Sequence, residues 1–212
     1  MKRNCMLVIA LVGMILAGKI SLASASGDSS PFLKTPEAGV VEPAQFQNPS
    51  IIELTEAEIA RAQKGLTISP VPINAGAGRT RMLIGLGSYL VNAVGGCNDC
   101  HTNPSYANGG DPFLGQAIKI NAANYLAGGV KFGPFTSRNL TPDPKRGNLP
   151  AGLRLDEFIN VIRTGQDRDL LHPQISPLLQ VMPWPVYRNM TDRDLQAIYL
   201  YLSAIPHAEP AP

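Results

Sequence analysis

The chain has 212 residues, of which 44% are hydrophobic and only 16% are charged. That length can bury a core in one or two domains, and the low charged fraction excludes a solvated disordered chain or a coiled coil. The formal net charge of +2 excludes the strongly basic surface of a nucleic-acid-binding protein, so we expect no nucleic-acid partner. The 20 glycines and 19 prolines indicate many loops and few long regular elements.

The N-terminal segment, residues 1–25, has the pattern of a secretory signal peptide. Two basic residues precede an apolar run from Cys5 to Gly18, and Ala23-Ser24-Ala25 offers a small-residue cleavage site. The alternative, an uncleaved membrane anchor, needs about 20 apolar residues, and Lys19 interrupts the run before that. We therefore expect a periplasmic protein, free or peripheral to the inner membrane, with no transmembrane segment in the mature chain.

Cleavage would change both the charge and the cysteine count. Three basic residues leave with the signal and no acid does, so the net charge falls from +2 to −1. Cys97 and Cys100 then remain as the only cysteines. In an exported protein, one close cysteine pair indicates a small disulfide unless a cofactor claims both sulfur atoms.

Residues 26–78 read as a proline-rich N-terminal extension with one short helix. Thr55 and Glu58 make a capping box, Ile59 and Ala62 share one helical face, and Gly65 is expected to end the helix. Prolines at 70 and 72 then break the chain. This composition suits a flexible periplasmic tether and a packed extension about equally well.

A domain over residues 79–206 is predicted from three amphipathic helices. The first runs from about Thr80 to Val94 and contains Gly85 and Gly87, which lower helix propensity and usually permit close approach of another backbone. Gly95-Gly96 ends it. The segment 102–150 that follows has turn chemistry and no helical or strand period, which is reasonable if its loops wrap a large flat ligand.

The other two helices lie in the C-terminal half, before a short tail at 207–212. One is predicted from about Leu155 to Thr164, with Phe158, Ile159 and Ile162 on its buried face and Gly165 as its stop. The last begins after an N-cap at Thr191, and Pro206 ends it. Its apolar stripe is formed by Leu195, Ile198, Tyr199 and Leu202.

The chemistry is carried by Cys97-Asn98-Asp99-Cys100-His101, which is the C-x-x-C-H attachment sequence for c-type haem. Positions 97, 100 and 101 fall on about one helical turn. Both thiols can therefore reach the vinyl groups of one porphyrin edge, while His101 becomes the proximal iron ligand. We expect one covalently attached haem c.

Three other interpretations of this motif compete with haem attachment. A thioredoxin-like C-x-x-C needs a βαβ context, which the helix-and-loop pattern does not offer. A structural zinc site would need His172 or His207 as a distant fourth ligand. A simple disulfide leaves the adjacent His101 and the export signal unexplained.

The sixth ligand of the iron is expected to be Met182, on a proline-rich loop before the last helix. Its thioether is a soft donor suited to iron. Ligation by His172 is the main competitor. Met190, next to the N-cap, is expected to pack against the helix, and Met82 and His207 are the remaining candidates in the mature chain.

These pieces resemble class I cytochrome c, particularly the haem domains of periplasmic dehydrogenase cytochrome subunits. The resemblance covers about residues 85–206, and it rests on an ordered set of segments, each weak alone except the haem motif. They are Gly87-Ser88-Tyr89-Leu90, Cys97–Thr102, Asn139–Asp143, Asp156-Glu157-Phe158, Arg163-Thr164-Gly165, Met182-Pro183-Trp184, Met190–Leu195 and Tyr199–Leu202. The chain departs from those subunits in having one haem motif where they usually carry three, and in lacking their Gly-Ile-Gly-x-Trp run.

The resemblance implies an all-α, class I cytochrome c fold of about three to five helices, with long loops wrapping the haem. The first and last helices of the domain would cross near the haem edge, at Gly85 and Gly87. The family roles make His101 proximal and Met182 distal. Arg138, Asn139 and Trp184 sit where such proteins often contact the haem propionates.

A six-coordinate haem has no open site for substrate, so the sequence predicts an electron carrier and not an enzyme. We expect it to link a dehydrogenase or a quinol-oxidising complex to a terminal acceptor such as an oxidase. The alternatives are a haem peroxidase or a small-ligand (gas) sensor with an open or labile distal site, and a non-redox interaction protein that uses the proline-rich arm.

Overall fold

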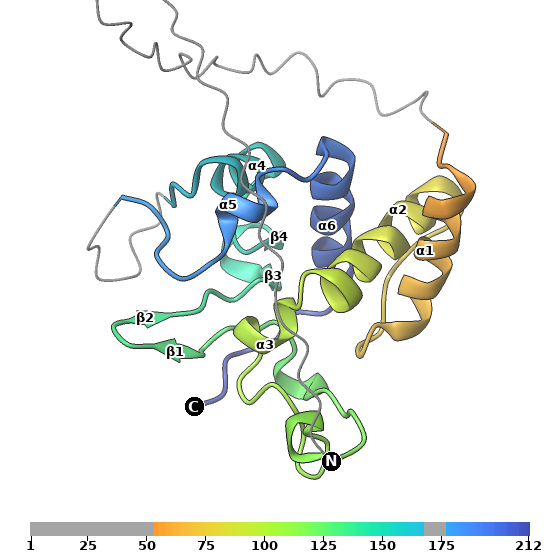
Figure 1. Cartoon of the computed structure of the whole chain (residues 1–212). Helices are drawn as coiled ribbons and strands as arrows, with labels where there is room; N and C mark the ends of the chain where they lie inside the picture. Colours follow the sequence, from red (N-terminus) through yellow and green to blue (C-terminus); the bar gives the residue numbers. More distant parts are fainter. Residues whose placement is uncertain (1–52, 168–176) are drawn as a thin grey trace, which may run out of the picture. The chain divides into compact units, whose positions relative to one another are not determined.

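The computed structural model describes residues 53–167 and 177–212, and over these the chain is mostly helical (Figure 1). The expected all-α class, with a cytochrome c-like arrangement, is therefore confirmed. The predicted signal peptide lies outside the described residues, as does His172. The helices are α1 (Glu56–Ile68), α2 (Gly78–Tyr89), α3 (Cys97–His101), α4 (Leu155–Thr164), α5 (Trp184–Tyr187) and α6 (Asp192–Ala204).

The looped segment between α3 and α4 contains only short elements, as its turn chemistry predicted. Two antiparallel hairpins of two-residue strands occur there, β1 (Lys131–Phe132) with β2 (Phe135–Thr136) and β3 (Pro142–Asp143) with β4 (Leu149–Pro150). Three 3₁₀ turns, η3 (Pro112–Leu114), η4 (Ala122–Asn124) and η5 (Pro144–Arg146), complete the segment.

Helix α1 begins as predicted and ends later than predicted. The Thr55 side chain accepts from the Glu58 backbone, and the Glu58 carboxylate bonds back to Thr55, so the capping box is present. Gly65 does not end the helix, which continues to Ile68. The reason is tertiary: a Cβ on Gly65 would overlap the Gly85 carbonyl of α2. Gly65 is therefore a contact residue inside the helix and not a stop signal.

Helix α2 lies between α1 and α6 and touches both (Figure 1). The two glycines predicted to allow close approach do so on different sides. A Cβ on Gly87 would overlap the Ala197 carbonyl of α6, whereas one on Gly85 would overlap the Ala62 carbonyl of α1. The crossing with α6 thus depends on Gly87, and Gly85 serves the extra N-terminal helix.

The helices α4 and α6 follow the sequence prediction closely. Gly165 ends α4 in the left-handed conformation (φ 72°), and Phe158 is buried on its inner face. At the start of α6, Thr191 and Asp194 form a capping box. The predicted stripe of α6 buries Leu195 and Leu202, but Ala197 and Tyr201 are buried too, because α2 covers a second face of this helix.

A polar network lies among the helices on the α1 side of the core. The hydroxyl of Tyr201 is 3.0 Å from that of Tyr125 and 2.9 Å from that of Ser69. Tyr125 donates to the Asn92 side chain at 2.5 Å, and Ser88 donates to the Gly65 carbonyl at 2.7 Å. Burial raises the pKa of Tyr125 far above its ordinary value, so this hydroxyl stays protonated. The network joins the N-terminal extension to the predicted domain.

The C-terminal tail packs back onto the loops after α3. His207 is 2.8 Å from the Pro142 carbonyl through Nδ1, and the Ala208 amide donates to Thr141 Oγ1 at 3.2 Å. The Asn139 side chain donates to the Ala208 carbonyl at 2.8 Å. Among the described residues, no helix is long and apolar enough to cross a membrane.

Candidate cofactor-binding site

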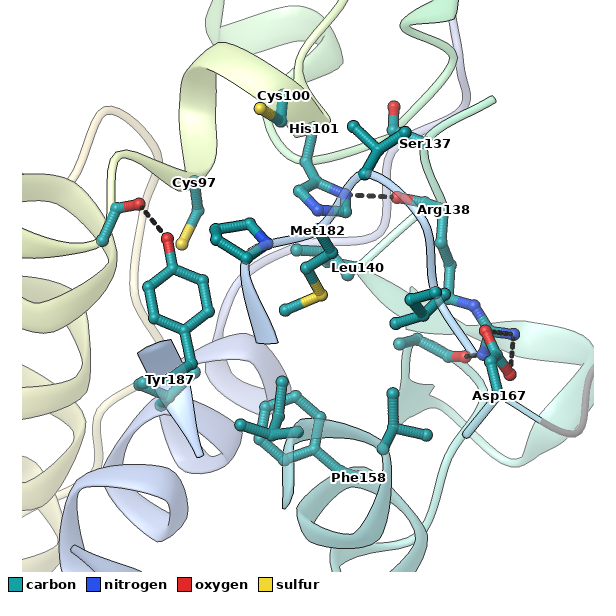
Figure 2. Close-up of a pocket in the computed structure, with 18 of the residues that line it drawn as sticks. Cys97, Cys100, His101, Ser137, Arg138, Leu140, Phe158, Asp167, Met182 and Tyr187 are labelled. Atoms are coloured by element: carbon teal, nitrogen blue, oxygen red, sulfur yellow. Dashed lines mark hydrogen bonds and ion pairs between the residues drawn. The ribbon is translucent and has the colours of Figure 1, made fainter. Parts of the chain in front are cut away.

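One apolar cavity is lined by α3, the β1–β2 segment, α4, α6 and the chain from Leu179 to Met190 (Figure 2). The sulfur and imidazole groups predicted to hold a haem line this cavity: Cys97, Cys100, His101 and Met182. Its remaining walls are mostly aliphatic and aromatic, including Leu140, Phe158, Ile162 and Leu202. Such a hollow, with few polar groups converging on one side, is typical of a cofactor site.

Helix α3 presents both cysteines of the motif to this cavity. The chain enters the helix through Gly96 in the left-handed conformation (φ 59°), and Thr102 closes the turn by donating to Asn98. Both cysteines are free thiols. Burial raises the pKa of the Cys97 thiol to about 12, and the neighbouring Cys100 adds to the shift. A raised pKa is the opposite of the lowered pKa of a thioredoxin-type nucleophile.

His101 points its ring into the cavity, where a backbone carbonyl orients it (Figure 2). Its Nδ1 lies 2.8 Å from the Arg138 carbonyl oxygen. A carbonyl can only accept, so Nδ1 carries the proton and the lone pair is on Nε2. Burial lowers the pKa of His101, which favours the neutral ring. A neutral imidazole whose second nitrogen is held in this way is the usual form of a metal-ligating histidine.

The Met182 side chain enters the same cavity from a different segment (Figure 2). The Met182 carbonyl accepts from the Trp184 amide at 2.8 Å, at the start of α5. Tyr187 then donates to the Gly95 carbonyl at 2.7 Å, which ties α5 to the chain entering α3. These two bonds hold the methionine segment against the haem motif.

The other candidates for the sixth ligand are placed differently. Met190 also lines the cavity, while packing against the core beside α6. Met82 packs against the separate cluster of Ala62, Leu86 and Leu90. His207 is bound to Pro142 and Glu209 and is not among the lining residues.

Of the three residues suggested to contact propionates, the structure brings only Arg138 to the cavity. Its guanidinium donates to the Ala151 carbonyl at 3.1 Å and pairs with Asp167 at 2.7 Å. Asn139 is turned toward the tail and accepts from both the Thr141 amide and hydroxyl. Trp184 packs against Gly165, where a Cβ would overlap the indole, and donates to the Leu179 carbonyl at 3.2 Å.

The lining residues that the sequence analysis did not propose include two polar ones that contact the predicted site residues or their flanks, Asp167 and Tyr187. Asp167 follows Gly165 closely, and nothing in its local pattern marks it as the partner of Arg138, 29 residues away. Tyr187 follows the methionine motif closely, and its aromatic ring beside a proline-rich loop is the signal that could have found it. Both act through tertiary contacts.

These contacts together fit a covalently bound haem. Two neutral thiols face one cavity, a neutral imidazole offers Nε2 beside them, and a thioether enters from another segment. Over the described ranges, no group of three or more histidine, cysteine, aspartate or glutamate side chains could hold a metal ion.

Comparison with known proteins supports a cytochrome c-like domain. The chain is 36% identical over 123 residues to a subunit of the nicotinate dehydrogenase of Pseudomonas putida, which covers 58% of this chain and 9% of that protein. It is 31% identical over 121 residues to the gluconate 2-dehydrogenase cytochrome c subunit of Pantoea cypripedii. This match covers 56% of this chain and 22% of that subunit. An alcohol dehydrogenase (quinone) cytochrome c subunit of Gluconacetobacter polyoxogenes is 31% identical over 122 residues. This match covers 56% of this chain and 21% of that subunit.

The chain therefore spans about a fifth or less of the length of these relatives. No family model and no solved structure matches it. The similarity and the mostly helical fold support a cytochrome c-like domain, similar to parts of dehydrogenase subunits.

Proposed function

We propose that this protein is a periplasmic, monohaem c-type cytochrome of class I that carries single electrons. The observation that carries the proposal is the convergence of Cys97, Cys100, His101 and Met182 on one apolar cavity. A haem bound there would supply a one-electron iron couple. By analogy with the dehydrogenase subunits to which it is similar, its partners are a dehydrogenase or quinol-oxidising complex as donor and a terminal acceptor such as an oxidase.

The residues of the cavity have distinct tasks in this proposal. Cys97 and Cys100 would hold the haem through two thioether bonds, each made by adding a cysteine S–H across one vinyl group without an oxidant. His101 would bind the iron through Nε2, and the contact of its Nδ1 with the Arg138 carbonyl would keep the ring oriented for this. Met182 would offer its thioether as the second protein ligand of the iron, and the apolar walls would limit the access of water to a bound haem.

The first test is the mass and visible spectrum of the mature protein, produced by export in a host with a cytochrome c maturation system. We expect a coloured protein whose denatured mass exceeds that of the polypeptide by one haem. In the Cys97→Ala, Cys100→Ala double variant, no haem should remain after denaturation. A colourless protein at apoprotein mass would contradict the proposal.

The second test is the Met182→Ala variant, measured as the ferric protein. We expect loss of the sulfur-to-iron charge-transfer band, because that band requires a thioether ligand. Met190→Ala is the matched control, since its side chain lines the same cavity, and it should keep the band. If only Met190→Ala lost the band, the thioether ligand would be assigned to Met190 and not to Met182. A high-spin wild-type spectrum would instead favour a peroxidase or a gas sensor.

A further inference from the structure

A largely buried ion pair forms part of the cavity wall beside the histidine. Asp167 and Arg138 both line the cavity, and a carboxylate oxygen of Asp167 lies 2.7 Å from Nη2 of Arg138. Their side chains are only 10% and 13% exposed, respectively. Charges at such a position interact strongly with anything bound in the cavity, because little water screens them.

Arg138 connects this pair directly to His101. The carbonyl of Arg138 holds Nδ1 of the histidine, while its guanidinium is held by Asp167 and by the Ala151 carbonyl (Figure 2). One residue thus spans from the imidazole to the carboxylate. Whatever fixes the guanidinium also limits where the carbonyl that orients His101 can lie.

We infer that Asp167 is a positioning residue that sets the reduction potential of the centre, both by its poorly solvated negative charge and by holding Arg138 in place. This inference rests on the proposed function. A negative charge on the cavity wall stabilises the oxidised centre, which carries one more positive charge than the reduced one. Asp167 therefore lowers the potential, and its neutralisation raises it.

The test is the midpoint potential of the haem-loaded Asp167→Asn protein, measured by spectroelectrochemistry. We expect a higher potential than in the wild type, because the ferric state loses a nearby anion while the Arg138 cation remains. The increase should persist at high salt, since a buried charge is poorly screened. Asp167→Glu, which restores the carboxylate, should bring the potential back toward the wild-type value.

The chain offers a matched control in a second arginine–aspartate pair. Arg163 and Asp192 are also 2.7 Å apart, but the Asp192 side chain is 68% exposed and neither residue lines the cavity. Asp192→Asn removes the same charge from the same type of pair. Its effect on the potential should be small and should vanish at high salt.

Two results would overturn the inference. One is an Asp167→Asn protein with a normal haem spectrum and a potential no different from that of Asp192→Asn. The other is a potential restored as well by Asp167→Leu as by Asp167→Glu, which would assign the residue a role in packing alone. If Asp167→Asn does not accumulate, Arg138→Gln gives the reciprocal test, because loss of the guanidinium cation beside an intact carboxylate should lower the potential. Failure to load haem in the wild type, by contrast, refutes the proposed function itself.

Discussion

At the residue scale, Thr102 shows how the site depends on single buried hydrogen bonds. Its side chain is fully buried directly after the haem motif, and its hydroxyl oxygen accepts from the Leu126 amide at 3.0 Å. Leu126 itself has a positive φ of 56°, a conformation rare for a non-glycine residue. We predict that Thr102→Val lowers the free energy of unfolding by about 1–3 kcal/mol, because it leaves a buried N–H without an acceptor.

Urea unfolding of the haem-loaded protein, followed by circular dichroism, measures this loss. Thr67→Val is the control, since Thr67 is exposed on α1, and it should change the stability by less than about 0.5 kcal/mol. Equal effects at the two positions would show that the Thr102–Leu126 bond contributes nothing particular.

The residue scale also shows what the sequence could and could not predict about the site. Cys97, Cys100 and His101 were predictable because their spacing is local and one helical turn brings them together. Met182 needed a loop argument, and it does line the same cavity. Asn139 was placed only by resemblance, and its side chain is used by the C-terminal tail. Its position depends on contacts with residues nearly seventy positions away, which no local pattern encodes.

At the element scale, the glycine contacts of α2 predict whether a glycine-to-alanine substitution raises or lowers the free energy of unfolding. In an exposed helix, glycine to alanine stabilises by about 1 kcal/mol. A Cβ at Gly87 would overlap the Ala197 carbonyl of α6, so the two helices would have to separate. We predict that Gly87→Ala lowers the free energy of unfolding by about 1–3 kcal/mol, the usual cost of overpacking.

Chemical denaturation of Gly87→Ala beside Lys64→Ala, an exposed position on α1, checks this prediction. The Lys64 variant should be neutral within about 0.5 kcal/mol. A stabilised Gly87→Ala protein would mean that α2 and α6 do not cross as closely as described.

The elements that were hardest to predict are those set by packing and not by periodicity. The bounds of α4 were predictable because its apolar face and Gly165 are both local signals. The end of α1 was mispredicted because a glycine in the sequence can either end a helix or allow close packing of a second helix. Gly65 does the latter. The chain between α2 and α3 is a π-helical turn, η2 (Leu90–Val94), directly before the haem motif. Such turns often occur near functional sites, but an amphipathic pattern does not distinguish them from α-helix.

At the scale of the whole molecule, the docking of the C-terminal tail should depend on pH. A hydrogen bond to Glu209 is the main cause that raises the pKa of His207 above its ordinary value of 6.5. The raised pKa means that the folded state favours protonated His207. Tail docking is therefore fully stabilised below about pH 6.5 and weakens as the pH rises through the raised pKa.

Hydrogen exchange at the Ala208 amide, corrected for the intrinsic rate, measures this docking because that amide donates to Thr141. Protection should be greater at pH 5 than at pH 8. In Glu209→Gln the difference should shrink, since the main cause of the shift is gone. Protection that increases with pH would contradict the sign of this linkage.

The largest-scale prediction concerns the boundary between the N-terminal extension and the predicted domain at residue 79. Helix α1 buries Ala62 and Gly65 against α2. It also bears Glu58, whose carboxylate pairs with Arg193 of α6 at 2.9 Å, both side chains being about one-fifth exposed. A detachable tether would not make these contacts. We predict that deletion of residues 1–78, behind a substitute export signal, lowers the stability by several kcal/mol or prevents haem loading.

The matched comparison is deletion of residues 1–52 behind the same signal, which keeps every described contact of α1. We expect this shorter deletion to leave the urea midpoint and the visible spectrum close to those of the full chain. The longer deletion exposes the apolar wall around Leu86 of α2 and Leu90 of η2. It also removes the Gly65 carbonyl that accepts from the buried Ser88 hydroxyl. Equal stability of the two truncated proteins would restore the tether hypothesis and place the domain boundary at residue 79. Unequal stability would move that boundary to the start of α1, because the helix would then be part of the cooperative fold that holds the site.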